Sequence, residues 1–234
     1  MFVDQNKIKI LIDSLNKYGI SNKYLQAGIL GVIYKETNFK PQAENLNYTA
    51  KRINQVWKKI PLEIAYNLAN NPEKLGNYVY GGKYGNSETE GYKYRGRGLN
   101  QLTFKDNYKY FGNLIGQDLV KNPDLLNNFN IASDVVAVFF ADTIKQGIKK
   151  GKFEKFNISK LEDINTLEKG LKVSIQANAG LNTNFENNIV QEGYNKAKSI
   201  IQDLYSKIDA KKSIAGAGII AVLIGAYFFF RNKK

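Results

Sequence analysis

The sequence contains no cysteine and no histidine among its 234 residues. Without cysteine there is no disulfide framework and no thiol nucleophile, and without histidine there is neither a Ser-His-Asp triad nor a usual zinc or haem site. Acid–base chemistry therefore falls to Asp, Glu, Tyr or Lys. Hydrolysis of a glycosidic bond is one of the few reactions that needs only a pair of carboxylates, so these absences favour it. We expect no metal and no cofactor.

Acidic side chains are outnumbered by basic ones along the whole chain. There are 34 Lys and Arg against 21 Asp and Glu, a formal net charge of +13, of which residues 207–234 carry +5 and residues 1–206 carry +8. This charge implies a polyanionic partner: nucleic acid, anionic lipid and the carboxylate-rich bacterial cell wall would each satisfy it. An AT-rich genome would also give many Lys and Asn residues. No recognised nucleic-acid motif is present, so a nucleic-acid partner is not expected.

Long uncharged runs are rare, and the longest covers residues 213–230, with Lys211 and Lys212 before it and Arg231-Asn-Lys-Lys234 after it. As a helix rising about 1.5 Å per residue, this stretch spans about 27 Å, near the short limit for a bilayer core. We expect a transmembrane helix over 213–230, with 207–212 as a basic juxtamembrane linker and 231–234 as a basic tail. A buried core helix is the alternative. Its small residues would also let a membrane or virion protein partner pack closely against it.

Apolar residues recur at helical spacing over much of residues 1–206, which predicts one mainly α-helical domain. Gly19 is expected to end the first helix, and Ser21 to cap the second at its N-terminus. Residues 80–98 differ, because they carry six glycines and four tyrosines and predict a loop or short hairpin. We interpret this segment as one wall of a cleft, where tyrosines offer flat faces to sugar rings. The predicted helices begin near residues 8, 21, 50, 64, 105, 131, 163 and 186, and the helix that begins near residue 64 is expected to end near Pro72.

Two glutamates, Glu36 and Glu44, lie eight residues apart where a predicted helix gives way to a loop. Glu36 follows the apolar run Val32-Ile33-Tyr34, so a low-dielectric surrounding and the negative end of the helix dipole would disfavour its ionised form. This environment suits a general acid. Glu44 follows Pro41 in an Asn-rich loop, where water and amide donors would keep it ionised and able to activate a water as a general base. Solvated carboxylates at a helix end are common, so this stretch alone leaves both interpretations open.

Several ordered motifs resemble those of the family 19 glycoside hydrolases, which include chitinases and phage endolysins that cut peptidoglycan. The matching segments span roughly residues 25–185; they are Glu44-Asn-Leu-Asn-Tyr-Thr-Ala50, Tyr80-Gly-Gly-Lys-Tyr-Gly-Asn86, Tyr92-Lys-Tyr-Arg-Gly-Arg-Gly-Leu-Asn-Gln-Leu-Thr103, Asp106-Asn-Tyr108 and, more weakly, Ile175-Gln-Ala-Asn-Ala-Gly180. The resemblance implies a lysozyme-like domain over residues 1–206, with Glu36 as acid, Glu44 as base and Thr103 as the hydroxyl that positions the attacking water. It also implies that substrate is bound by Tyr48, Tyr94, Arg95, Gln101, Asn107 and Asn178.

The sequence departs from the family pattern at three positions. Lys35 stands where the family usually has His before its catalytic Glu, Phe104 replaces the Gly that usually follows Gln-Leu-Thr, and Ala179 replaces a Gly beside Asn178. Each departure bears on substrate geometry, but none removes a carboxylate.

The predicted function is that of a bacteriophage muralytic enzyme. It would hydrolyse the β-1,4 bonds of peptidoglycan glycan strands with inversion, held to the virion membrane or the host inner membrane by residues 213–230, for host lysis or virion entry. The alternatives are a chitinase, a lytic transglycosylase with a single catalytic carboxylate, and a non-catalytic glycan-binding virion membrane protein.

Overall fold

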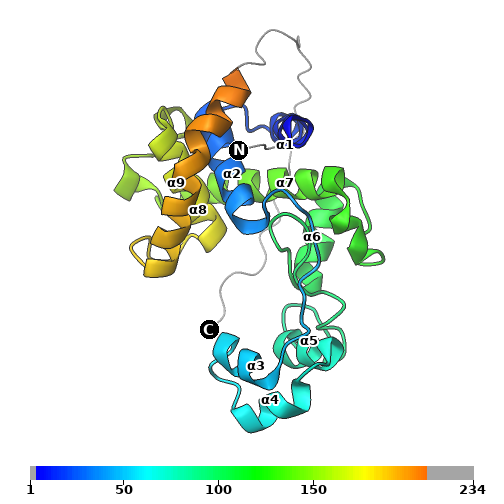
Figure 1. Ribbon diagram of the computed structural model, residues 1–234. Coiled ribbons are helices and arrows are strands. Elements are labelled where there is room, and N and C mark those ends of the chain that lie inside the picture. Colours follow the sequence, from blue (N-terminus) through cyan, green and yellow to red (C-terminus); the bar gives the residue numbers. More distant parts are fainter. Residues whose placement is uncertain (1–3, 210–234) are drawn as a thin grey trace.

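The computed structural model describes residues 4–209 (Figure 1). These residues form nine α-helices and three short 3-10 helices without a β-sheet, and their one bridge of β type joins Arg97 to Leu102. The predicted mainly α class is confirmed. The transmembrane helix predicted over 213–230, with its linker and basic tail, lies outside the described residues. Among residues 4–209, no helix is both long and apolar enough to cross a membrane.

The central helix is α2 (Lys23–Thr37), which packs against both α8 (Leu167–Ala179) and α9 (Asn188–Asp209) (Figure 1). Residues 25–33 of α2 are all buried, as expected of a helix with neighbours on every side. The N-cap of α2 is Asn22, whose side-chain oxygen accepts hydrogen bonds from the first-turn amides. The predicted cap, Ser21, is therefore wrong by one residue. Asn22 is favoured because its amide nitrogen also donates to a carbonyl just before α8, at Ile164.

The helices α2 and α8 meet at a glycine contact. A Cβ atom at Gly28 would overlap the carbonyl of Gly170, and a Cβ atom at Gly170 would overlap the carbonyl of Tyr24. Eight residues after Gly28 comes Glu36, and eight residues after Gly170 comes Asn178, and these two side chains are hydrogen-bonded. The two helices therefore run in the same direction, and their close approach brings both C-terminal ends together.

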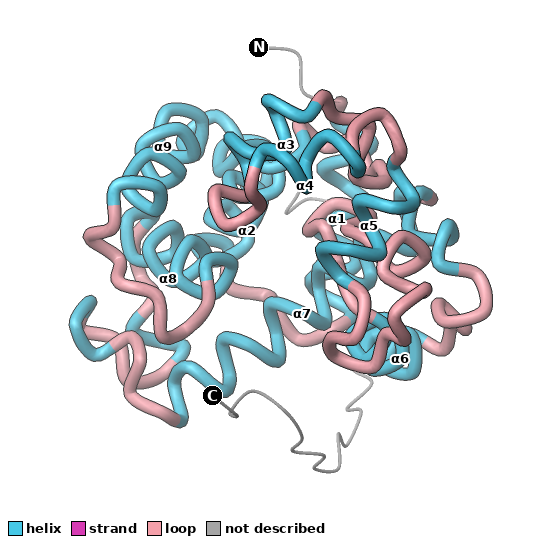
Figure 2. Tube along the Cα trace, turned by 90° about the horizontal axis from the view of Figure 1, so that it is seen from below, coloured by secondary structure: helices cyan, strands magenta, loops and turns pink. Residues whose placement is uncertain are grey.

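A long helix, α7 (Phe129–Lys149), connects the group around α2 with the other side of the molecule (Figure 2). It packs against α1 (Gln5–Lys17), where Asp134 accepts hydrogen bonds from Ser14 and Lys17, and against α8. A second hydrophobic cluster joins it to α6 (Lys105–Ile115). The three 3-10 helices cover Pro123–Asn127, Glu154–Phe156 and Leu161–Asp163.

Three short helices form a separate group at the bottom of Figure 1: α3 (Ala50–Val56), α4 (Leu62–Leu68) and α5 (Pro72–Tyr80). They enclose a small hydrophobic cluster of their own, which includes Leu46 from the preceding loop. The sequence did not predict α5, because Pro72 was interpreted as the end of a helix. Instead Pro72 occupies the first turn of α5, where its missing N–H is not needed, and Asn71 caps that turn.

Candidate active site

Glu36 lies in the last turn of α2, where its carboxylate oxygen Oε1 has two polar neighbours. Asn178 Nδ2 donates to it at 3.0 Å, and Lys35 Nζ lies 2.6 Å away as an ion pair. The side chain is 30% exposed. The predicted low-dielectric wall around Glu36 is therefore wrong: the apolar run before it faces the buried interior, whereas the carboxylate turns toward solvent. Lys35, one of the departures from the family pattern, thus contacts the proposed acid directly.

Glu44 lies in the loop between α2 and α3. The last residue of α5 binds its side chain, and the segment after α5 binds its backbone. The hydroxyl of Tyr80 is 3.0 Å from Oε1 and 2.9 Å from Oε2 of the Glu44 carboxylate. The Glu44 N–H donates to the Gly96 carbonyl at 2.7 Å, and the Glu44 carbonyl accepts from Arg95 Nε at 3.2 Å. Burial, and then the neighbouring Glu44 carboxylate, raise the pKa of Tyr80, so its hydroxyl keeps the proton that it donates.

Thr103 and Gln101 gather around Gly96, the residue whose carbonyl binds Glu44. A Cβ atom at Gly96 would lie 3.0 Å from Gln101 Oε1 and 3.5 Å from Thr103 Oγ1. Gln101 Nε2 also donates to the carbonyl of Gln42, two residues before Glu44. The structure therefore brings Glu44, Thr103 and Gln101 into one cluster, although they lie up to 59 residues apart in sequence.

Two of the predicted substrate-binding residues support the backbone of this cluster. The Arg95 guanidinium lies 3.9 Å from the centre of the Tyr92 ring and donates to the Tyr92 carbonyl. Burial, and then the nearby Arg97, lower the pKa of Arg95. Asn107 lies in the first turn of α6 and donates to the carbonyl of Thr103 at 2.7 Å. Arg95 therefore fixes the backbone of Glu44, and Asn107 fixes the backbone of Thr103.

The two predicted tyrosine contacts differ in accessibility. The Tyr94 side chain is fully buried and donates its hydroxyl hydrogen to the Val120 carbonyl, so it presents no face to a sugar. This placement contradicts a direct substrate contact by Tyr94, because its ring is packed inside the second hydrophobic cluster. Tyr48 is half-buried, and its ring packs 5.8 Å from the ring of Trp57.

Strained backbone conformations gather beside the two glutamates. Seven non-glycine residues within 4–209 have a positive φ, a conformation that L-residues rarely adopt. Five of the seven flank the glutamates: two directly follow the Glu36 helix and three lie in the segments that contact Glu44 and Tyr80. Those five are Asn38, Phe39, Tyr84, Gln101 and Phe104. Such strain costs about 1–3 kcal/mol per residue and is concentrated at functional sites in proteins.

Phe104 is the most marked of these outliers, with φ 75° and ψ 139°. This conformation explains why glycine is usual at the position, since a Cβ atom there is strained. The Phe104 ring packs edge-on against Tyr80, with centroids 5.7 Å apart, and against Tyr84 at 4.7 Å. From the sequence, Phe104 was only a departure from the family pattern, and the contact between Tyr80 and Glu44 was not predicted. Tyr80 begins the second matching motif, which is the signal that marks it.

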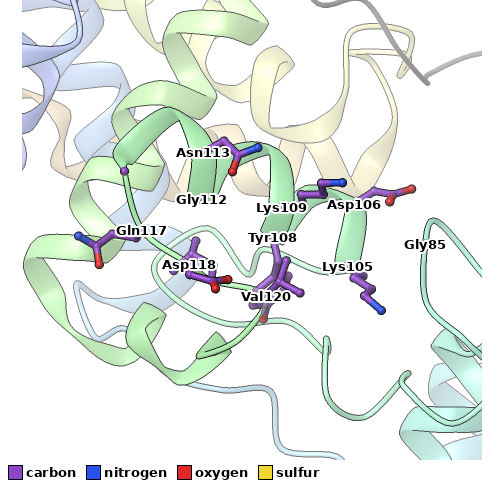
Figure 3. A pocket seen from close by; sticks show the side chains of 12 residues that line it. Gly85, Lys105, Asp106, Tyr108, Lys109, Gly112, Asn113, Gln117, Asp118 and Val120 are labelled. Carbon is purple, nitrogen blue, oxygen red and sulfur yellow. The ribbon is translucent and has the colours of Figure 1, made fainter.

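A cavity of about 760 Å³ opens between α6 and the loop that follows it (Figure 3). Its lining includes Lys105, Asp106, Lys109 and Asp118, and none of the predicted catalytic or substrate-binding residues. We therefore do not assign the substrate to this cavity. In the part of the chain that the structure describes, no three acidic side chains gather as they would around a metal ion.

Comparison with known proteins points to one family. The family model for glycoside hydrolase family 19, described as chitinase class I, matches residues 37–158. This span includes Glu44 and Thr103 and begins one residue after Glu36. The chain is also 32% identical over 175 residues to a glycosyl hydrolase family 19 domain-containing protein of Haemophilus influenzae. That alignment covers 72% of this chain and 77% of the Haemophilus protein.

Proposed function

The chain belongs to glycoside hydrolase family 19, and from this premise we propose that it is a muralytic enzyme that cuts the β-1,4 bonds of peptidoglycan glycan strands. The observation that carries the proposal is that two carboxylates, Glu36 and Glu44, are each held by a different set of neighbouring residues. Glu36 is exposed at the joined ends of α2 and α8, and Glu44 is fixed by Tyr80 beside Thr103. In this proposal Glu36 and Glu44 are the only residues that exchange protons with the substrate and the attacking water.

Each carboxyl group takes one role in an inverting mechanism. Glu36 donates a proton to the leaving glycosidic oxygen, and its exposure gives a sugar chain access to it. Glu44 accepts a proton from a water that attacks the opposite face of the sugar, and the Thr103 hydroxyl positions that water. Such a mechanism needs about 6.5–9.5 Å between the two carboxyl groups, which leaves room for the water.

Charge supports the cell wall as the substrate. Residues 1–206 carry a formal charge of +8, which favours a wall rich in carboxylates over neutral chitin. Chitin remains the second candidate, because the matching family model is described as chitinase class I. A lytic transglycosylase and a non-catalytic glycan-binding protein are the remaining alternatives, and the experiment below distinguishes all four.

Attachment to a membrane is a further part of the proposal. It rests on the uncharged stretch 213–230 and the basic residues on both sides of it. We propose that this stretch anchors the enzyme to a virion membrane or a host inner membrane, in a bacteriophage that uses the activity for lysis or entry.

The test is product analysis by mass spectrometry on intact peptidoglycan and, in parallel, on soluble chitin oligomers. We expect hydrolysis of peptidoglycan to products with reducing ends. Glu36→Gln is expected to abolish hydrolysis while glycan binding remains, because the amide keeps the shape of the side chain but has no proton to transfer. Glu44→Gln is also expected to lose nearly all activity. Glu63→Gln is the matched control, since Glu63 is exposed on α4 and has no predicted role in the site.

Other results would change the assignment. Preference for chitin oligomers would make the protein a chitinase. Products with 1,6-anhydro ends, together with full activity of Glu44→Gln, would indicate a lytic transglycosylase. Binding of both glycans without any cleavage would leave only the non-catalytic alternative.

A further inference from the structure

We propose that Tyr80 and Phe104 are positioning residues for Glu44: the hydroxyl of Tyr80 orients the Glu44 carboxylate, and the ring of Phe104 fixes the ring of Tyr80. The inference rests on the proposed function, because it gives the pair a task only if Glu44 is the general base. Tyr80 contacts the base and Phe104 contacts Tyr80, and neither residue is assigned a contact with the reacting sugar.

The hydroxyl of Tyr80 contacts both oxygens of Glu44 almost equally, at 3.0 and 2.9 Å. A donor placed between two carboxylate oxygens restricts rotation of the carboxylate plane, which is otherwise a soft torsion in glutamate. The donor comes from the last residue of a helix, α5, whereas Glu44 lies in a loop. The contact therefore ties a loop side chain to a more rigid element, as precise catalytic geometry requires.

The ring of Phe104 holds Tyr80 from the side. The two rings meet at 87°, an edge-to-face arrangement that aromatic pairs favour. Hydrogen bonds fix the strained backbone of Phe104, since its N–H donates to Tyr94 and its carbonyl accepts from Tyr108. A bulky residue persists in such a conformation only where its surroundings determine it, and here that conformation aims the ring at Tyr80 and Tyr84.

Other polar groups around Glu44 have different tasks. Arg95 binds the Glu44 carbonyl rather than its carboxylate. Tyr48 lies near Tyr80 and contributes to raising the pKa of the Tyr80 hydroxyl, after burial and Glu44 itself. Tyr80 is thus kept protonated as a donor, and its proton points to the carboxylate.

The experiment measures kcat and KM of full-length variants on the glycan that the wild type cleaves. Tyr80→Phe removes only the hydroxyl, and we expect a loss in kcat of at least tenfold with KM within twofold. Phe104→Gly suits the backbone conformation but removes the ring, and we expect a smaller loss in kcat with the unfolding temperature nearly unchanged. Phe104→Tyr keeps the edge contact and should therefore keep most of the wild-type kcat. Tyr66→Phe is the control, because Tyr66 is 68% exposed on α4.

A structural role alone would lower the unfolding temperature but leave kcat per folded molecule unchanged, so that result for Tyr80→Phe overturns the inference. If Glu44→Gln is inactive in the same assay, the proposed function survives that result. If the wild type cleaves no glycan, the proposed function fails. A double-mutant cycle that measures the unfolding temperature then tests whether Tyr80 and Glu44 interact. Non-additive losses for Tyr80→Phe and Glu44→Ala support the contact, whereas additive losses overturn it.

Discussion

Thr103 donates its hydroxyl hydrogen to the Gln101 carbonyl, 2.9 Å away, which leaves its oxygen as an acceptor for a water hydrogen. We expect Thr103→Ala to lower kcat about 10–100-fold with little change in KM, because a hydrogen bond to the attacking water acts mainly in the transition state. Steady-state kinetics on purified glycan fragments measure both constants. Thr103→Ser is the control, since it keeps the hydroxyl and should keep most of kcat. A rise in KM with unchanged kcat would instead place Thr103 on the sugar.

At the scale of single residues, the sequence singled out residues that the structure brings together, but it did not predict their surroundings. Glu36, Glu44, Thr103 and Asn178 were assigned from motifs, and Asn178 does reach the Glu36 carboxylate. The exposure of Glu36 was not predicted, because which face of a helix end turns outward depends on how neighbouring helices pack. The contact of Tyr80 with Glu44 joins residues 36 positions apart, and no local pattern encodes it.

The segment between α5 and α6 is tied to α6 by an ion pair of Glu90 and Lys105, 2.9 Å apart. The Ser87 N–H, and then Lys105, lower the pKa of Glu90 from 4.5 to about 2. A carboxylate whose pKa is lowered by folding stabilises the folded state at any pH above the pKa it has in the unfolded chain. This stabilisation disappears as the pH falls from about 4.5 to about 2. We therefore expect Glu90→Gln to lower the unfolding temperature at pH 6 by about 2–4 °C and to make little difference near pH 2.

Thermal unfolding followed by circular dichroism between pH 2 and 6 checks this expectation. Glu192→Gln is the control, because Glu192 is exposed on α9. Equal losses for Glu90→Gln at both ends of the pH range would contradict an electrostatic origin.

At the scale of elements, helical periodicity identified most helices but neither α5 nor the form of the segment after it. A proline such as Pro72 is found both at the end of one helix and in the first turn of the next. Here it begins α5, because Asn71 caps the N-terminus of that helix. Residues 80–98 were predicted as a loop or short hairpin, and after Tyr80 they form a loop without a strand. Their shape comes from contacts with α5, Glu44 and α6, which lie far away in sequence.

For the whole molecule, we expect the full chain to sediment with membranes and to resist extraction by high salt and carbonate. A chain of residues 1–209 is expected to stay in the supernatant. Leu223→Arg should release the full chain, because Arg at the centre of a membrane helix costs about 2.5–3.5 kcal/mol. Membrane fractionation with immunoblotting measures each case. A full chain that remains in the supernatant without detergent would contradict the anchor.

The sequence predicted a single domain over residues 1–206, and the described residues bury their apolar side chains in three clusters. Glu36 extends from the largest cluster, and Tyr80, which fixes Glu44, borders the cluster of α3 to α5. How clusters sit relative to one another follows from long-range packing, and motif spacing carries no information about it. The distance between acid and base is therefore a property of the tertiary structure.

The glycine contact between α2 and α8 has a mechanical consequence. Glu36 and Asn178 each stand eight residues beyond it, which at about 1.5 Å per residue makes two lever arms of about 12 Å. Rotation by about 5° at the crossing would displace the two helix ends by about 1 Å, enough to impair catalysis. A methyl group added at Gly170 would overlap the Tyr24 carbonyl, so the two helices would have to shift relative to each other. The relative position of Glu36 and Asn178 thus depends on a contact between two glycines that lies about two helix turns away from the carboxylate.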